Sequence, residues 1–201
     1  MTLWATFDCY GTLVDWNAGI RAVVGDELLV RYHEIEPQVQ SESPTLSYRD
    51  VMREVLRRIG FADVDALGRS LPDWPVFPEV PGAVSRARED GWKLAILSNT
   101  DRDFIEASMT KIGVAFERAI VASEIGSYKP ALGHWRAFAD DVGRLPDVHV
   151  GASHVHDVVP AAQLGISTVW INRLGESEDP APTRELPDLA RLPQTLTELV
   201  G

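Results

Sequence analysis

Short apolar runs alternate with segments of helical periodicity along most of the chain. The runs lie at residues 3–7, 93–97, 119–121, 148–150 and 167–171, and helical patterns follow at 101–112, 131–141 and 157–164. Such alternation predicts β-α units that build a parallel sheet with helices on its faces. We therefore expect an α/β fold with a Rossmann-like core. No GxGxxG pattern follows the first run, so a dinucleotide site is not indicated.

A long helical stretch interrupts this alternation between the first and the second run. Five apolar residues are spaced like one face of a helix: Ile20, Val23, Val24, Leu28 and Ile35. A second helical pattern covers residues 48–59, and Ser47 could cap it. Prolines at 72, 75, 78 and 81 then restrict the return of the chain. We expect a discontinuous core of residues 1–14 and 77–201, an inserted small α-helical cap subdomain over 15–76, and a surface loop at 175–187.

Composition narrows the class of protein. The chain has 201 residues, of which 45% are hydrophobic, enough for one buried core with an insertion. No window approaches the roughly 18 uninterrupted apolar residues of a membrane helix, and no signal-peptide pattern precedes the first run. We expect a cytoplasmic protein. Cys9 is the only cysteine, so neither an intrachain disulfide nor a cysteine-based zinc site is indicated.

The net charge concerns the partners of the protein. A formal charge of −11 argues against nucleic acid and against anionic membrane surfaces, because both require concentrated Lys and Arg. A small anionic substrate would have to be held by a few local cations against an unfavourable overall field. Lys129 and Arg31 are the candidates for that role.

Asp8 stands where the first apolar run gives way to a turn containing Gly11. In a parallel sheet this is the carboxyl end of a strand, where ligands bind, so the carboxylate is a candidate for chemistry. An aspartate that only caps a turn would give the same local pattern. The motif alone leaves both interpretations open.

Three further motifs, in a fixed order, decide between them. Ser98-Asn99-Thr100 follows the second run, Tyr128-Lys129-Pro130 comes next, and residues 151–157, Gly-Ala-Ser-His-Val-His-Asp, follow a later run. With Asp8-Cys9-Tyr10-Gly11-Thr12, these four sites resemble the haloacid dehalogenase superfamily and, within it, the L-2-haloacid dehalogenase (type II) branch. The resemblance implies that the helical subdomain closes over the active site, and it is compatible with a homodimer.

The resemblance also implies roles for individual residues. Asp8 would be the nucleophile, and the catalytic set would be Asp8, Thr12, Lys129 and Asp157. The substrate-binding set would be Tyr10, Arg31, Ser98, Asn99 and His154. Lys129 would keep Asp8 ionised, since a nearby ammonium lowers the pKa of a carboxyl group. Arg31 and Asn99 would receive the departing halide.

Two positions favour dehalogenation over phosphate-ester hydrolysis. Phosphatases of the superfamily carry an aspartate two residues after the nucleophile, which protonates the leaving alkoxide, whereas this chain has Tyr10. They also place an acid directly after the glycine of the fourth motif to hold Mg²⁺, whereas this chain has Ala152. We therefore expect a reaction without a metal or other cofactor. A Mg²⁺-dependent phosphatase and a catalytically inactive binding protein are the alternatives.

Four positions depart from the branch or are hard to align. Arg31 is matched through the neighbouring Ile35-Glu36 pair, and Arg21 is a rival for the same role. Ala152 and His154 stand where the branch has a serine and an asparagine, and His154 could accept a hydrogen bond or act on water. Trp135 stands where a tyrosine is expected. These changes leave the natural substrate open.

Overall fold

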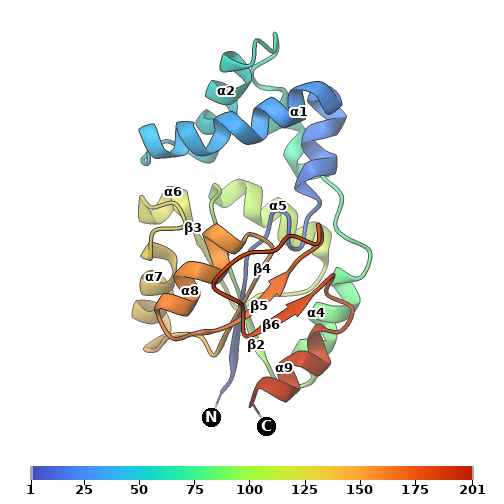
Figure 1. The fold of residues 1–201 in the computed structure, drawn as a ribbon, viewed down its shortest axis with the longest axis vertical. Helices are drawn as coiled ribbons and strands as arrows, with labels where there is room; N and C mark the ends of the chain where they lie inside the picture. Colours follow the sequence, from blue (N-terminus) through green and yellow to red (C-terminus); the bar gives the residue numbers. More distant parts are fainter. Residues whose placement is uncertain (1, 201) are drawn as a thin grey trace.

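The computed structural model describes residues 2–200, and its centre is a parallel sheet of six strands (Figure 1). The strands are β1 (Trp4–Phe7), β2 (Lys93–Ser98), β3 (Arg118–Val121), β4 (Val148–Gly151), β5 (Ser167–Ile171) and β6 (Arg184–Leu186). Their order across the sheet is β3-β2-β1-β4-β5-β6, and every neighbouring pair is parallel. The expected α/β fold is confirmed. β6 lies inside the segment that we expected to be only a surface loop.

Alternate residues of the strands pack on opposite faces of the sheet, as the pleat of a β-strand requires. Phe7 and Ile96 belong to the larger apolar cluster, whereas Trp4 and Leu97 belong to the other. The helices around the sheet are α4 (Val80–Glu89), α5 (Arg102–Ile112), α6 (Ala122–Ile125), α7 (Gly133–Val142), η2 (His154–Val158), α8 (Val159–Gln163) and α9 (Leu192–Val200). In Figure 1, α4 and α9 lie together on one side of the sheet, and α7 and α8 lie on the other.

The cap helices form a layer of their own beyond the carboxyl edge of the sheet (Figure 1). They are α1 (Trp16–Glu42), α2 (Tyr48–Arg58), α3 (Ala66–Ser70) and η1 (Leu71–Asp73). The Ser47 side chain accepts a hydrogen bond from the backbone N–H of Asp50, so it caps α2 as expected. Inside α1, Gly25 adopts φ 78° and ψ 172°, and the helix bends sharply there.

The bend changes which face of α1 is buried. Before Gly25 the buried residues include Ile20 and Val24, which belong to the expected face. After Gly25 the buried residues are Leu29, Tyr32, Glu36 and Val39, one position beyond the expected Leu28 and Ile35, which are only partly buried. One residue corresponds to about 100° around a helix. The second half of α1 therefore presents a different face from the one that the periodicity predicted.

The two connections between core and cap helices run side by side. Val14 and Val76 form an antiparallel bridge, and the N–H of Asp15 donates to the carbonyl of Pro75 at 2.7 Å. On the core side, the N–H of Phe77 donates to the carbonyl of Leu13 at 3.1 Å. The entry and exit segments are thus paired, so one narrow connection joins the cap helices to the core. Between residues 2 and 200, no helix has the length and hydropathy needed to cross a membrane.

Candidate active site

Three of the four sequence motifs meet at the carboxyl edge of the sheet, and Lys129 of the fourth reaches them, as described below. Asp8 follows β1, Ser98 ends β2, and Asp157 follows β4 by six residues. β1 lies between β2 and β4 and pairs with both in parallel, so the ends of these strands lie next to each other. The N–H of Asp8 donates to the carbonyl of Val150 at 2.9 Å, which extends this pairing to Asp8 itself.

Lys129 joins the two carboxylates of the site. Its Nζ lies 2.8 Å from Asp8 Oδ1 and 2.6 Å from Asp157 Oδ1. Lys129 and Asp157 are 2% and 1% exposed, and Asp8 is 8% exposed. Buried charges need close partners because they lose their hydration. The three side chains therefore form one ionic unit with a net charge of −1 when all are ionised.

Thr12 fixes the second oxygen of Asp8. Its hydroxyl donates to Asp8 Oδ2 at 2.9 Å, and the N–H of Ala152 donates to Thr12 Oγ1 at 2.8 Å. Thr12 is fully buried and does not line the cavity described below. It orients the carboxylate and links the turn after β1 to the loop after β4.

Asp157 is held from behind by groups of β4 and the loop after it. The N–H of Ser153 lies 3.2 Å from Asp157 Oδ2, and His149 Nε2 lies 3.2 Å from Oδ1. His149 Nδ1 lies 2.9 Å from the hydroxyl of Thr6, so both ring nitrogens have a partner. A Cβ added to Gly151 would lie 2.4 Å from Asp157 Cβ, so only glycine admits this approach. Sequence reasoning missed His149, although a histidine within a fully buried strand is a visible signal.

Burial and charge move the pKa values of the three ionic groups. Burial raises the pKa of Asp8, and the Lys129 ammonium and the Thr12 hydrogen bond only partly oppose this. The Lys129 ammonium thus acts on the Asp8 pKa in the expected direction, but burial outweighs it. Burial works against the charge of Asp157 as well, but the Lys129 ammonium and the His149 hydrogen bond hold its pKa below the usual range. Burial also opposes the charge of Lys129, yet the two carboxylates raise its pKa.

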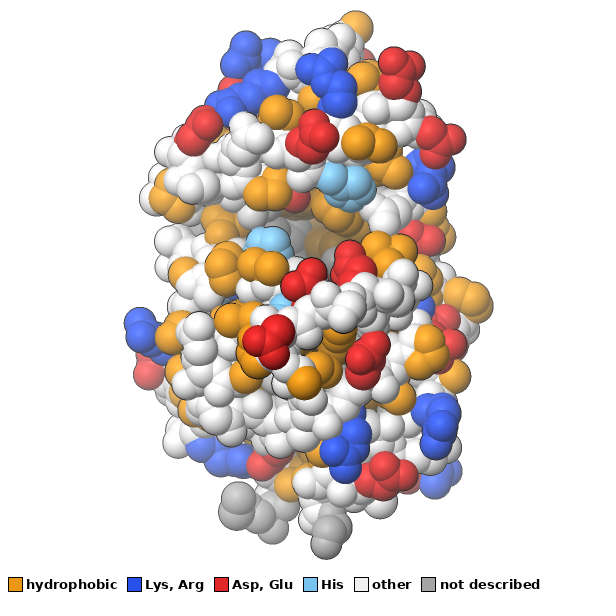
Figure 2. Space-filling view, viewed as in Figure 1, with side chains coloured by type: hydrophobic (Ala, Val, Ile, Leu, Met, Phe, Trp, Pro, Cys, Tyr) orange, Lys and Arg blue, Asp and Glu red, His pale blue; other side chains and the backbone are white. Residues whose placement is uncertain are grey.

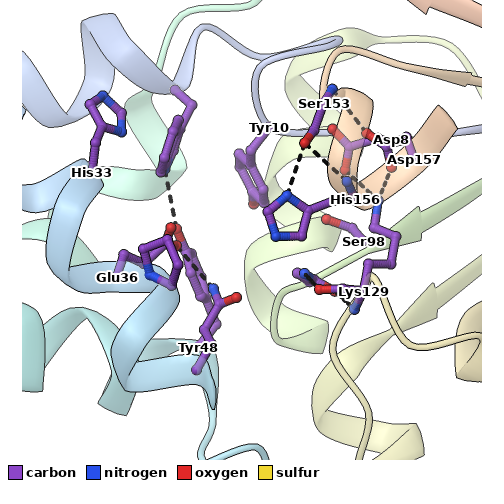
Figure 3. A pocket seen from close by; sticks show the side chains of 14 residues that line it. Asp8, Tyr10, His33, Glu36, Tyr48, Ser98, Lys129, Ser153, His156 and Asp157 are labelled. Carbon is purple, nitrogen blue, oxygen red and sulfur yellow. Dashed lines mark hydrogen bonds and ion pairs between the residues drawn. The ribbon is translucent and has the colours of Figure 1, made fainter. Parts of the chain in front are cut away.

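A cavity of about 300 Å³ lies between this ionic unit and the cap helices. Figure 2 shows its mouth as a hollow with histidine side chains at the rim. The core wall is formed by Asp8, Tyr10, Ser98, Asn99, Lys129, Ser153, His156 and Asp157. The cap wall is formed by Trp16, His33, Glu36, Pro37, Gln40 and Tyr48. The labelled cap residues face the core residues across the cavity in Figure 3.

Ser98 and Asn99 differ in their hydrogen bonds. Ser98 Oγ is buried and has no hydrogen-bond partner among residues 2–200, although the residue lines the cavity. An unpaired buried hydroxyl is costly unless a ligand satisfies it. Asn99 instead uses its amide on Lys129: Nδ2 donates to the Lys129 carbonyl at 3.0 Å, and Oδ1 accepts from the Lys129 N–H at 2.6 Å. Asn99 therefore positions the lysine.

Tyr10 lies on the floor between core and cap. Its ring stacks on Tyr48 with centroids 6.4 Å apart, and its hydroxyl lies 3.0 Å from Ser108 Oγ. Burial raises the pKa of Tyr10 well above its usual value, so the phenol stays neutral. A neutral phenol tied to Ser108 is a poor proton donor for a leaving alkoxide.

Two residues expected in the site lie outside the cavity. Arg31 is exposed on α1 and does not line the cavity, because the bend at Gly25 turns this part of the helix. The rival Arg21 pairs with Asp26 at 2.6 Å and does not line it either. His154 is buried, with Nε2 2.8 Å from the carbonyl of Pro180. Neither Arg31 nor His154 therefore reaches the cavity in this structure.

His156 lines the cavity instead, two residues beyond His154. Its Nδ1 lies 2.8 Å from Ser153 Oγ, and burial lowers its pKa. η2 is a single turn of π-helix, and of its two histidines it is His156 that lines the cavity. Trp135 is fully buried and packs on the His149 ring at 5.0 Å, beneath the site.

The donor set does not fit a divalent cation. Asp8 and Asp157 are the two carboxylates at the core wall, and the Lys129 ammonium already joins one oxygen of each. The two positions that would supply a further acid carry Tyr10 and Ala152. Within the part of the chain that the structure describes, no three His, Cys, Asp or Glu side chains are grouped to hold a metal ion.

Comparisons with known proteins place this site in a family. A family model described as haloacid dehalogenase-like hydrolase matches residues 4–165. The chain is 32% identical to the (S)-2-haloacid dehalogenase of Pseudomonas sp. (strain YL), over 84% of this chain and 82% of that protein. It is 29% identical to the phosphoserine phosphatase of Thermus thermophilus, over 68% of this chain but only 59% of the length of that protein.

Solved structures agree on the fold. The L-2-haloacid dehalogenase from Xanthobacter autotrophicus, with chloropropionic acid covalently bound, superposes with a TM-score of 0.86 at 18% identity, over 98% of this chain and 99% of that one. The match includes both the sheet and the cap helices, since it extends over almost the whole length. The chain therefore belongs to the haloacid dehalogenase-like hydrolases, in the L-2-haloacid dehalogenase branch.

Proposed function

We propose that the protein hydrolyses short 2-haloalkanoic acids to 2-hydroxy acids and halide through an aspartyl ester on Asp8. Asp8 attacks C2 of the substrate with one carboxylate oxygen, a C–O bond forms, and the halide leaves with the electron pair of the C–X bond. Lys129 and Thr12 hold the carboxylate in place for this attack. The similarity to the (S)-2-haloacid dehalogenase of Pseudomonas sp. supports the proposal.

The substrate carboxylate would bind on the core wall. The unpaired Ser98 hydroxyl is a donor aimed at the cavity, and the Lys129 ammonium supplies the positive charge. Both line the same wall as Asp8, so a short acid held there would present C2 to the attacking oxygen. The cavity of about 300 Å³ suits a small molecule of this kind.

Water then cleaves the ester at the carbonyl carbon of Asp8. His156 is neutral because burial lowers its pKa, and Ser153 holds its Nδ1, which leaves Nε2 on the cavity side. We propose that Nε2 accepts the proton from this water, the role that the sequence suggested for His154. Asp8 is regenerated, and it keeps one oxygen atom from water.

The observation that carries the proposal is the environment of Tyr10. A halide leaves without a proton, whereas the alkoxide of a phosphate ester needs one, and Tyr10 is a neutral phenol bonded to Ser108. A phosphatase is the second candidate, because the chain resembles the phosphoserine phosphatase of Thermus thermophilus over part of its length. A cytoplasmic location and a homodimer stay predictions from the sequence.

The test compares both activities in one preparation. Halide release is measured with chloro-, bromo- and fluoroacetate and with both enantiomers of 2-chloropropionate, and phosphate release is measured with phosphoserine and a generic phosphate ester. We expect halide release that survives EDTA, is not raised by Mg²⁺, and disappears in Asp8→Asn. Phosphate release that requires Mg²⁺, without any halide release, would overturn the proposal in favour of a phosphatase.

A further inference from the structure

The cap wall of the cavity carries a carboxyl group and no cation. Glu36 is 9% exposed, lies on the buried face of α1 and lines the cavity. The hydrogen bond that the structure gives it comes from Gln40 Nε2 to Oε1, at 3.1 Å. Within residues 2–200, no charged side chain contributes to the pKa of this carboxyl. A buried carboxylate without a counter-charge is unfavourable, so its presence in a catalytic cavity calls for a functional reason.

The opposite wall offers Glu36 no free counter-charge, because the Lys129 ammonium is already paired with two carboxylates. Asp8, Lys129 and Asp157 carry a net charge of −1 across the cavity, and an anionic substrate would add another. Burial without a counter-charge favours the neutral form of a carboxyl group. Because Gln40 donates to Oε1, a neutral Glu36 carries its proton on Oε2, which is then a hydrogen-bond donor on the cap wall of the cavity.

The line of attack decides which anion this is. In a displacement at C2 the leaving group departs opposite the attacking oxygen, and the wall opposite Asp8 is the cap wall with Glu36 and Tyr48 (Figure 3). Arg31 and Arg21, the two cations considered for this place, do not line the cavity. The departing halide therefore meets a carboxyl group where a guanidinium was expected.

We propose that Glu36, protonated on Oε2, donates the cap's hydrogen bond to the departing halide. The inference rests on the proposed function, since it assumes a displacement at C2. As the C–O bond to Asp8 forms and the C–X bond breaks, the halide takes the electron pair and accepts this hydrogen bond, and the proton stays on Glu36. The donor helps most where the leaving group is most basic, so it should favour chloride and fluoride substrates relative to bromide.

The proton on Glu36 makes this device dependent on pH. Burial raises the pKa of Glu36 to about 7, and the Tyr48 hydroxyl opposes part of that shift. The titratable groups around it are His33 and Tyr32 on its own helix, Tyr48 on α2, Tyr128, and across the cavity Asp8, Lys129, His156 and Asp157. Burial lowers the pKa values of His33 and His156 and raises that of Tyr48 well above its usual value, so these three are neutral where Glu36 titrates.

Substitutions at two positions of α1 test the donor. Glu36→Gln keeps a donor that cannot ionise, Glu36→Ala removes it, and Glu34→Gln is the matched control, because Glu34 is exposed on the same helix. In the wild type and in Glu34→Gln, kcat for 2-chloropropionate should fall about tenfold per pH unit above pH ~7. Glu36→Gln should lose this alkaline decrease. Glu36→Ala should be slow at every pH, and slower relative to wild type for chloride than for bromide.

A measurement without turnover separates this inference from the proposed function. The side-chain carboxyl of Glu36 is titrated by ¹³C NMR, assigned with Glu36→Gln, with and without sodium bromide. We expect a midpoint near 7 that bromide raises, whether or not halide release is found. A midpoint near the ordinary glutamate value of about 4.3, or no response to bromide, would overturn the role of Glu36 even if the enzyme releases halide.

Discussion

The carboxylate of Asp8 and the ammonium of Lys129, 121 residues apart in the chain, lie 2.8 Å apart in a buried pair. The same ammonium also joins Asp157, so removal of Lys129 would leave two buried carboxylates without a counter-charge. Lys129→Met should therefore abolish halide release and cost about 3–5 kcal/mol of the free energy of unfolding. Urea unfolding measures the loss of stability, and a halide assay measures the loss of activity. Near wild-type stability would contradict the ionic unit described above.

The pKa of Asp8 predicts the acid side of the pH profile. Burial raises this pKa, and the nucleophile must be ionised, so activity is present above the raised value and falls as the pH drops through it. The pKa of Asp157 is lowered instead, so its contribution to stability persists down to the unfolded value of about 3.9 and is lost only as the pH falls further. We therefore expect kcat/KM to fall while circular dichroism still shows a folded protein. Activity that is lost only together with the fold would contradict this order.

Gly151 tests the tight packing behind Asp157. A Cβ at this position would lie 2.4 Å from Asp157 Cβ, so Gly151→Ala must displace the carboxylate from Lys129 and His149. We expect loss of most activity and a lower melting temperature. Gly82→Ala is the control: it lies exposed in α4 with no atom within 4 Å of the added Cβ, and it should stabilise the protein by about 0.4–1 kcal/mol. If both substitutions changed activity and melting temperature to the same extent, close packing of Gly151 on Asp157 would be contradicted.

Substitution of Arg31 tests whether this residue assists halide departure, as the sequence match implied, or takes no part in it, as its place outside the cavity implies. Because Arg31 is exposed and does not line the cavity, Arg31→Ala should leave kcat for chloride and bromide substrates within about twofold and stability within about 0.5 kcal/mol. Arg21→Ala should behave in the same way. A large loss of kcat in Arg31→Ala alone would show that the cap rearranges during turnover to bring this arginine to the halide.

The core was predictable because its signals are local. Apolar runs placed five strands, and the motifs after three of them placed Asp8, Ser98 and Asp157 at one edge of the sheet. β6 was missed because it is a short edge strand of which only Leu186 is buried. α4 was missed because Pro81 was interpreted as part of a stiff linker, whereas proline fits the first turn of a helix.

The cap wall was not predictable from periodicity. A helical pattern fixes the face of a helix only while the helix is continuous, and the left-handed conformation of Gly25 shifts the phase of all that follows. The expected face through Leu28 and Ile35 would have carried Arg31 along, whereas the observed face carries Tyr32 and Glu36. Similarly, the turn of π-helix after Ser153 decides that His156, and not His154, reaches the cavity.

The covalent ester on Asp8 is the central claim, and one turnover in ¹⁸O-labelled water tests it most directly. With enzyme in excess over 2-chloropropionate, the hydroxyl oxygen of the product comes from Asp8, and an oxygen atom from water replaces it in the Asp8 carboxylate. Mass spectrometry of the peptide that contains Asp8 should therefore show one ¹⁸O atom, and the 2-hydroxypropionate should be unlabelled. Label in the product and none in Asp8 would mean that water attacks C2 directly, which would contradict the account.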